Sequence, residues 1–159
     1  MAETSLIAEP GKQDVVISRV FDAPRDLVFK ACTDPELISQ WWGPKAFTTT
    51  VDAMDVRPGG TWRYVQRGAG GEDYGFHGAY HDVTPPERLI YTFEFEPMPG
   101  HVALETVTLE DLDGRTKVTD RVVYQTVEDR DGTLQSGMEE GMNETMDRFT
   151  ELVEEMQKE

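Results

Sequence analysis

The sequence has little cysteine and no long apolar run, and these absences limit where the protein can work. Of its 159 residues only Cys32 carries a thiol. No disulfide can therefore form within the chain, and a lone thiol is typical of a reducing compartment. No apolar stretch approaches the roughly 18–20 residues that span a bilayer. The first residues, MAETSLIAEPGKQD, lack the charged front and apolar centre of a signal peptide. We expect a cytoplasmic protein that does not insert into a membrane.

Basic residues are also scarce. Fifteen Lys and Arg stand against 31 Asp and Glu, which gives a formal net charge of −16. A surface of this sign repels phosphate groups, so nucleic acids and anionic membranes are poor partners.

The usual signatures of catalysis and metal binding are missing as well. There is no Gly-x-Ser-x-Gly, no phosphate-binding glycine loop and no cluster of Cys and His. His77 and His81 should lie about 13 Å apart along one strand, too far for one metal ion. His101 follows Pro-Gly and is predicted to lie in a loop, and Cys32 is expected to be a small buried residue. We predict no metal, no cofactor and no catalytic residue, and the pattern leans away from an enzyme.

Hydrophobic periodicity predicts a strand, two short helices, six more strands and a long final helix. The strands are expected at 13–21, 46–56, 61–67, 72–83, 88–96, 101–111 and 115–126. Pro24 should begin one short helix, and Asp34 should cap the other. The final helix is expected from about residue 131 to 157. Residues 1–12 are predicted to be a flexible tail before a single domain at 13–159.

Five segments, in this order along the chain, carry a resemblance to a known family: RVFDAPRDLVFKACTDPELISQWWGP, DVRPGGTWRY, GAYHDVTPPERLIYTFEF, ETVTLED and GMEEGMNETMDRF. Together they resemble the family related to activators of the heat-shock protein 90 ATPase, in the START-like (SRPBCC) superfamily. The resemblance covers about residues 14–157. It implies an α+β helix-grip fold, in which a curved seven-stranded antiparallel sheet surrounds the long C-terminal helix. Two short helices follow the first strand, and a cavity usually lies between sheet and long helix.

Two adjacent tryptophans end the second short helix, just before Gly43 and Pro44. Neighbouring helical residues point about 100° apart, so the two rings cannot be buried equally in one direction. We expect Trp41 to pack beneath the end of the sheet and Trp42 to lie nearer the rim of the cavity. The alternative is that both rings only close the end of the sheet.

The last hairpin indicates which side chains face the inside. If the Asp-Gly pair at 113–114 forms a two-residue turn, residues whose numbers sum to 227 face each other. The inner face is then apolar except for Glu105 and Asp120, whose Cβ atoms are about 7–8 Å apart or less. Desolvation and mutual repulsion should raise the pKa values of such a pair. The alternative is that both carboxylates lie at a wet cavity mouth or pair with arginines of neighbouring strands.

We predict a module that binds a small hydrophobic or amphipathic molecule between the sheet and the final helix. The predicted lining combines aromatic rings, two carboxylates and two methionines: Trp42, Trp62, Tyr64, Phe76, Tyr91, Phe93, Glu105, Asp120, Met138 and Met142. For the methionines, simple core filling is the alternative.

Two other functions stay open. A cyclase- or hydrolase-type enzyme could use Glu105 or Asp120 as general base. A chaperone-interacting role is implied only by the name of the resembling family, and the sequence identifies no protein partner.

Overall fold

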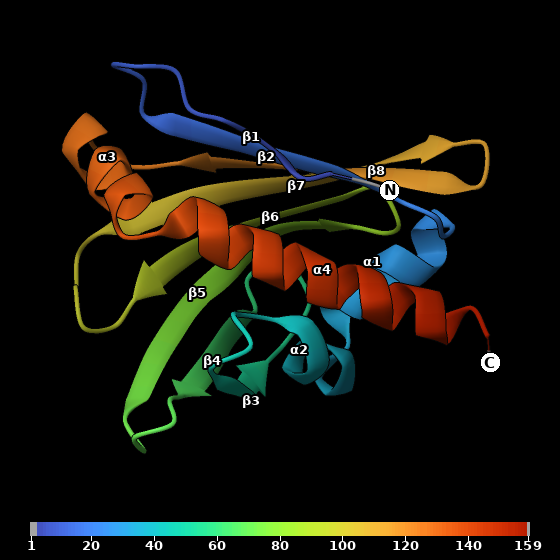
Figure 1. Cartoon of the computed structure of the whole chain (residues 1–159), viewed down its shortest axis with the longest axis horizontal. Helices are drawn as coiled ribbons and strands as arrows, with labels where there is room; N and C mark the ends of the chain where they lie inside the picture. The colour runs from blue at the N-terminus through green and yellow to red at the C-terminus, as the bar shows by residue number, and fades with distance from the viewer. Residues whose placement is uncertain (1–2, 159) are drawn as a thin grey trace.

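The computed structural model describes residues 3–158 and shows one antiparallel sheet that curves around a long helix. The strands are β1 (Ser5–Ile7), β2 (Asp14–Phe21), β3 (Thr48–Met54), β4 (Thr61–Arg67), β5 (Asp73–Thr84), β6 (Arg88–Phe95), β7 (Val102–Leu112) and β8 (Arg115–Val123). Their order across the sheet is β1-β2-β8-β7-β6-β5-β4-β3. The helices are α1 (Arg25–Thr33), α2 (Pro35–Trp41), α3 (Val127–Gln135) and α4 (Met138–Met156). Figure 1 shows α4 lying across one face of the sheet. The predicted α+β helix-grip fold is confirmed.

The sheet has eight strands rather than the predicted seven. The extra strand, β1, lies within residues 1–12, for which the sequence predicts a flexible tail and no strand. It pairs antiparallel with β2, and Leu6 is opposite Ile17. Leu6 packs against the cluster of Val15 and Ile17, and this apolar contact accounts for the ordering of so short a strand.

The predicted single helix over 131–157 is wrong in its first part. The structure has two helices there, because Gly137 adopts a φ of 92° between them. This left-handed conformation suits glycine and ends a helix. The N-cap of α3 is Thr126, whose hydroxyl accepts a hydrogen bond from the backbone N–H of Asp129 at 3.0 Å. The separate α3 therefore begins earlier than predicted.

The two short helices close one end of the sheet. As predicted, Asp34 caps α2 by accepting the Glu36 N–H at 2.9 Å. Trp41 is buried, stacks on Phe149 of α4 at a centroid distance of 4.1 Å, and donates its indole N–H to the Ala31 carbonyl at 2.9 Å. This ring therefore fastens α1, α2 and α4 together.

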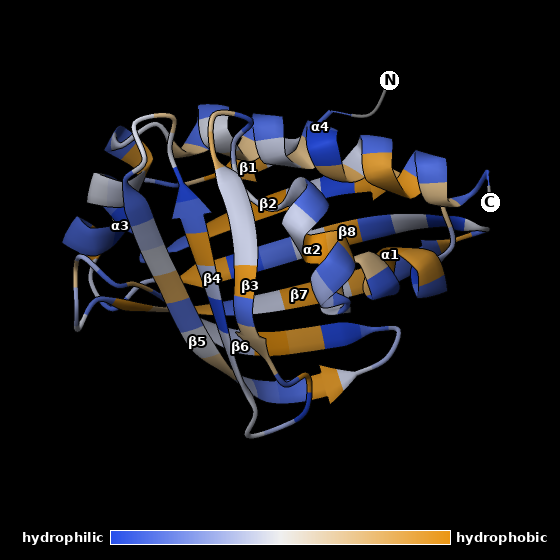
Figure 2. Ribbon diagram, turned by 90° about the horizontal axis from the view of Figure 1, so that it is seen from below, coloured by the Kyte–Doolittle hydropathy of each residue, from blue (hydrophilic) through white to orange (hydrophobic). Residues whose placement is uncertain are grey.

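The register predicted for the last hairpin is confirmed from the pair Leu104–Val123 to the pair Leu112–Arg115. Val107, Leu109 and Val118 are buried, whereas Thr108 and Arg121 are exposed. Figure 2 shows the resulting alternation of hydrophobic and hydrophilic residues along the strands. Within residues 3–158 no helix is both long and apolar enough to cross a bilayer.

Candidate functional site

A cavity of about 790 Å³ lies between the concave face of the sheet and the helices. A volume of this size suits a drug-sized molecule. All ten residues predicted as ligand contacts line this cavity: Trp42, Trp62, Tyr64, Phe76, Tyr91, Phe93, Glu105, Asp120, Met138 and Met142. The structure thus brings them together, while their role in binding stays a prediction.

Aromatic rings from three neighbouring strands form the floor of the cavity. The Trp62 ring centroid lies 4.6 Å from that of Tyr64, 5.9 Å from Phe93 and 6.1 Å from Tyr91. Gly78 is opposite Trp62 on β5, and a Cβ there would be only 2.7 Å from the indole nitrogen. The missing side chain leaves room for the indole beside β5.

Trp42 is half-buried and extends this aromatic floor toward α2. Its ring meets Tyr64 edge-on at 5.0 Å and Phe76 edge-on at 5.1 Å. Both tryptophans border the cavity, but Trp42 is half-buried whereas Trp41 is buried, and this split agrees with the 100° between adjacent helical side chains.

Glu105 and Asp120 are the two carboxylates on the central strands of this face. The pairing of Val107 with Asp120 and of Glu105 with Val122 makes them diagonal neighbours. The Tyr91 hydroxyl donates to Glu105 Oε1 at 3.4 Å. Within residues 3–158 neither carboxylate has an ion-pair partner, so pairing with arginines of neighbouring strands does not occur.

Burial shifts the ionisation of both groups. It raises the pKa of Asp120 well above its ordinary value, and the negative charge of Glu105 adds to this rise. Burial also raises the pKa of Glu105, against the lowering effect of its neighbours Asp120 and Tyr91. The pair therefore retains a proton at pH values where two isolated carboxyl groups would both be ionised.

Three buried side-chain polar atoms of the described chain lack a hydrogen-bond partner: Arg19 Nε, Trp62 Nε1 and Asp120 Oδ1. All three belong to residues that line the cavity. A buried polar atom without a partner is costly and uncommon. The unpartnered buried side-chain atoms of residues 3–158 thus all belong to the lining of one cavity.

Cys32, the one cysteine of the chain, lines the cavity but is not an activated nucleophile. Burial, together with the charge of Asp120, raises the pKa of the Cys32 thiol to about 12, so it stays protonated near neutral pH. The thiol is half-buried, because it opens onto the cavity. Burial raises the pKa of Tyr80 to about 12 as well, so this phenol remains a neutral hydrogen-bonding group.

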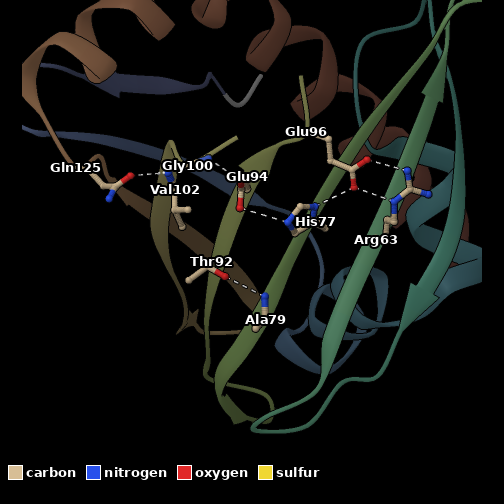
Figure 3. Close-up of polar contacts among 9 residues, drawn as sticks. All are labelled: Arg63, His77, Ala79, Thr92, Glu94, Glu96, Gly100, Val102 and Gln125. Carbon is tan, nitrogen blue, oxygen red and sulfur yellow. Dashed lines mark hydrogen bonds and ion pairs between the residues drawn. The ribbon is translucent and has the colours of Figure 1, made fainter. Parts of the chain in front are cut away.

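One end of the cavity is bordered by α3 and the loop between β6 and β7. His101 lies in this loop, as predicted, and its Nδ1 is 2.9 Å from Asp129 Oδ1 of α3. Gln125 accepts the Val102 N–H at 2.8 Å, and Glu94 accepts the Gly100 N–H at 2.9 Å (Figure 3). No local sequence pattern indicates these contacts, because they depend on how the loop folds back.

A second polar cluster lies on the opposite, convex face of the sheet and was not predicted (Figure 3). Arg63 donates two hydrogen bonds to the Glu96 carboxylate, each at 2.8 Å. The His77 ring lies between two carboxylates, 2.9 Å from Glu96 and 3.3 Å from Glu94. Arg63, and next His77, lower the pKa of Glu96 to about 2. Among residues 3–158 no group of three His, Cys, Asp or Glu side chains is arranged to hold a metal ion.

Comparisons with known proteins agree with this geometry. The family model of the activator of Hsp90 ATPase homolog 1-like protein matches residues 22–154. A solution structure of a protein from Arthrobacter aurescens is similar, with a TM-score of 0.88, 25% identity and coverage of 95% of this chain and 91% of that one. A crystal structure of a Rhodobacter sphaeroides protein gives a TM-score of 0.86, 27% identity and coverage of 95% and 98%. A solution structure of a Staphylococcus epidermidis protein gives a TM-score of 0.80 and 27% identity, and the match covers 93% of each chain. Comparison with curated protein sequences gave no match.

Proposed function

The chain belongs to the activator of Hsp90 ATPase homolog 1-like family, and on this basis we propose that it binds a small hydrophobic or amphipathic molecule in its cavity. The fold of this family commonly binds ligands. The observation that carries the proposal is the cavity of about 790 Å³, whose lining includes the three residues with unpartnered buried side-chain polar atoms within residues 3–158. A mostly apolar pocket with a few convergent polar groups is typical of a small-molecule site.

Binding of an uncharged, environment-sensitive fluorophore tests this proposal. Met142 lines the cavity from α4, so Met142→Trp should fill part of the space and weaken binding at least several-fold while the domain stays folded. Glu151 lies on the exposed face of the same helix, and Glu151→Trp adds the same ring without entering the cavity. Equal affinities in these two variants would contradict binding in the cavity.

An acid–base enzyme is the second candidate, and the raised pKa values of the neighbouring carboxyl groups of Glu105 and Asp120 support it. Carboxyl pairs with perturbed pKa values are frequent in active sites. If the protein turns over a molecule that it retains during purification, Glu105→Gln should abolish the conversion and preserve binding. Conversion at the parent rate in this variant would exclude Glu105 as the general base.

The cysteine content and the net charge support proposals for the cellular compartment and the partners of the protein. We place it in the cytoplasm, where the lone thiol of Cys32 would stay reduced. The net charge of −16 makes nucleic acid a poor partner. A protein partner such as a chaperone would be identified by pull-down with the full chain.

A further inference from the structure

The charges that line the cavity are strongly unbalanced. Four carboxylates line it, Glu105, Asp120, Glu128 and Asp129, and Arg19 is the one arginine or lysine among its lining residues. Arg19 already forms an ion pair with Asp147 of α4, in which its Nη1 lies 2.9 Å from Asp147 Oδ1. His101 also lines the cavity and is paired with Asp129. The described chain therefore provides no counter-ion for the two central carboxylates.

We propose that the bound molecule is an amphipathic amine whose ammonium group lies between Glu105 and Asp120. This inference rests on the proposed binding function and assigns the chemical class of the ligand. The ammonium would donate to Asp120 Oδ1, the buried carboxylate oxygen that has no partner within residues 3–158. Hydrogen bonds between ionised groups are among the strongest in proteins.

The surrounding rings favour the same charge. The Tyr91 hydroxyl lies 3.4 Å from Glu105, and the ring of Trp62 lies 6.1 Å from that of Tyr91. The other aromatic rings that line the cavity would add to the attraction wherever the ammonium meets a ring face. The methionines of α4 would cover the apolar part of the ligand.

Anions and simple alcohols fit less well. An anion would meet a protein of net charge −16 and four carboxylates in the cavity itself. An alcohol could accept or donate a hydrogen bond, but it would leave the buried negative charge uncompensated.

Amine binding should also depend on pH in a defined direction. The pair binds a cation best after it has lost its shared proton, so affinity for the amine should increase as pH rises from about 5.5 to 8.5. The other titratable groups that line the cavity are Tyr91 on β6, Tyr124 after β8, Tyr64 on β4, Tyr80 on β5, Cys32 on α1 and Arg19 on β2, together with His101 in the loop before β7 and Glu128 and Asp129 on α3. The pKa values of these four tyrosines and of Cys32 are raised, so they stay neutral over this range. The side chains that α4 contributes to the cavity are uncharged: Met138, Met142, Thr145, Met146 and Phe149.

Competition between matched ten-carbon probes tests the ligand class. Decylamine, decanol and decanoate are each used to displace the uncharged fluorophore from the full-chain protein at about pH 8. We expect decylamine to bind roughly tenfold to a hundredfold more tightly than decanol, and decanoate to bind most weakly. Glu105→Gln with Asp120→Asn should bring decylamine and decanol to within about threefold of each other.

A charge-matched control separates the cavity from the acidic surface. Glu154 and Glu155 are exposed on α4, so Glu154→Gln with Glu155→Gln also replaces two carboxyl groups by amides and should leave the amine preference unchanged. If the surface variant loses the preference as fully as the cavity variant does, adsorption to the surface explains it and the inference is overturned.

The remaining outcomes separate the ligand class from the proposed function. If decanol binds as tightly as decylamine, and Met142→Trp weakens both, the amine inference fails while binding in the cavity stands. If neither probe displaces the fluorophore and Met142→Trp has no effect, both fail. Should the double variant not fold, the parent decides: amine affinity that is flat or falls with rising pH overturns the inference.

Discussion

The two faces of this sheet hold carboxylates of the same kind in opposite states. On the convex face, Glu96 receives two hydrogen bonds from Arg63 and one contact from His77, and its pKa falls to about 2. On the concave face, Glu105 and Asp120 have no cationic partner within the described chain, and their pKa values rise. Neither the residue type nor the net charge decides the ionisation state. The local partners and the access to water decide it.

This contrast separates structural charges from functional ones. The convex carboxylate is satisfied by the protein itself and ties β4 to the segment after β6. Within the described residues the concave pair has no cationic partner, and its Asp120 Oδ1 lacks a hydrogen-bond partner in a cavity that also contains unpartnered nitrogens of Arg19 and Trp62. Stability alone would favour apolar residues at such positions, so the concave pair is better explained by binding.

The largest test adds one carboxylate to each face. Val107 is buried opposite Asp120, and its neighbour Thr108 is exposed on the other face. Val107→Asp places an unpaired charge beside an existing one and should lower the free energy of unfolding by about 3–5 kcal/mol. Thr108→Asp should change it by no more than about 0.5 kcal/mol. Urea unfolding at neutral pH measures both, and equal losses would mean that the faces are assigned wrongly.

The second test removes the concave pair and follows stability with pH. The folded-state pKa values of Glu105 and Asp120 are raised, so the folded protein holds more protons than the unfolded chain above about pH 4. The free energy of unfolding should therefore fall as pH rises toward and through the raised values, by about 1.4 kcal/mol per pH unit for each proton that only the folded protein retains.

Glu105→Gln with Asp120→Asn should abolish this part of the pH dependence and be more stable than the parent at about pH 8. Chemical unfolding of the two proteins between about pH 5 and 9 gives the difference directly. A difference that stays constant over this range would show that the pair is ionised normally in the folded state.

Much of the concave face could be predicted, because its pattern is local. The Asp-Gly turn at 113–114 determines the register of β7 and β8. Alternation on the strands and the 100° step between Trp41 and Trp42 then place the site residues on one lining. These signals need no knowledge of the distant chain.

The features that escaped prediction have physical reasons. The strand β1 is only three residues long, too short for a periodic pattern. The break at Gly137 was hidden because Leu134, Met138 and Met142 continue the apolar spacing across it. The convex cluster joins Arg63, His77 and Glu96 from separate segments, and its register depends on β5 pairing with β4 and β6 rather than on a short turn.

The smallest expected effect comes from the convex carboxylate, and its sign is opposite to that of the concave pair. The folded-state pKa of Glu96 is lowered to about 2, so its stabilising contribution is complete above its ordinary pKa and is lost as pH falls toward 2. Glu96→Gln should be slightly less stable than the parent at neutral pH, and this difference should shrink as pH falls from about 4.5. The effect is small because Arg63 is 39% exposed, and water and salt screen the pair.

Thermal unfolding at about pH 3 and pH 7, in low and in high salt, measures this difference in stability, and Glu110→Gln on the exposed surface of β7 is the control. If Glu96→Gln instead became more stable than the parent with rising pH, as expected for the concave pair, the contrast between the two faces would be wrong.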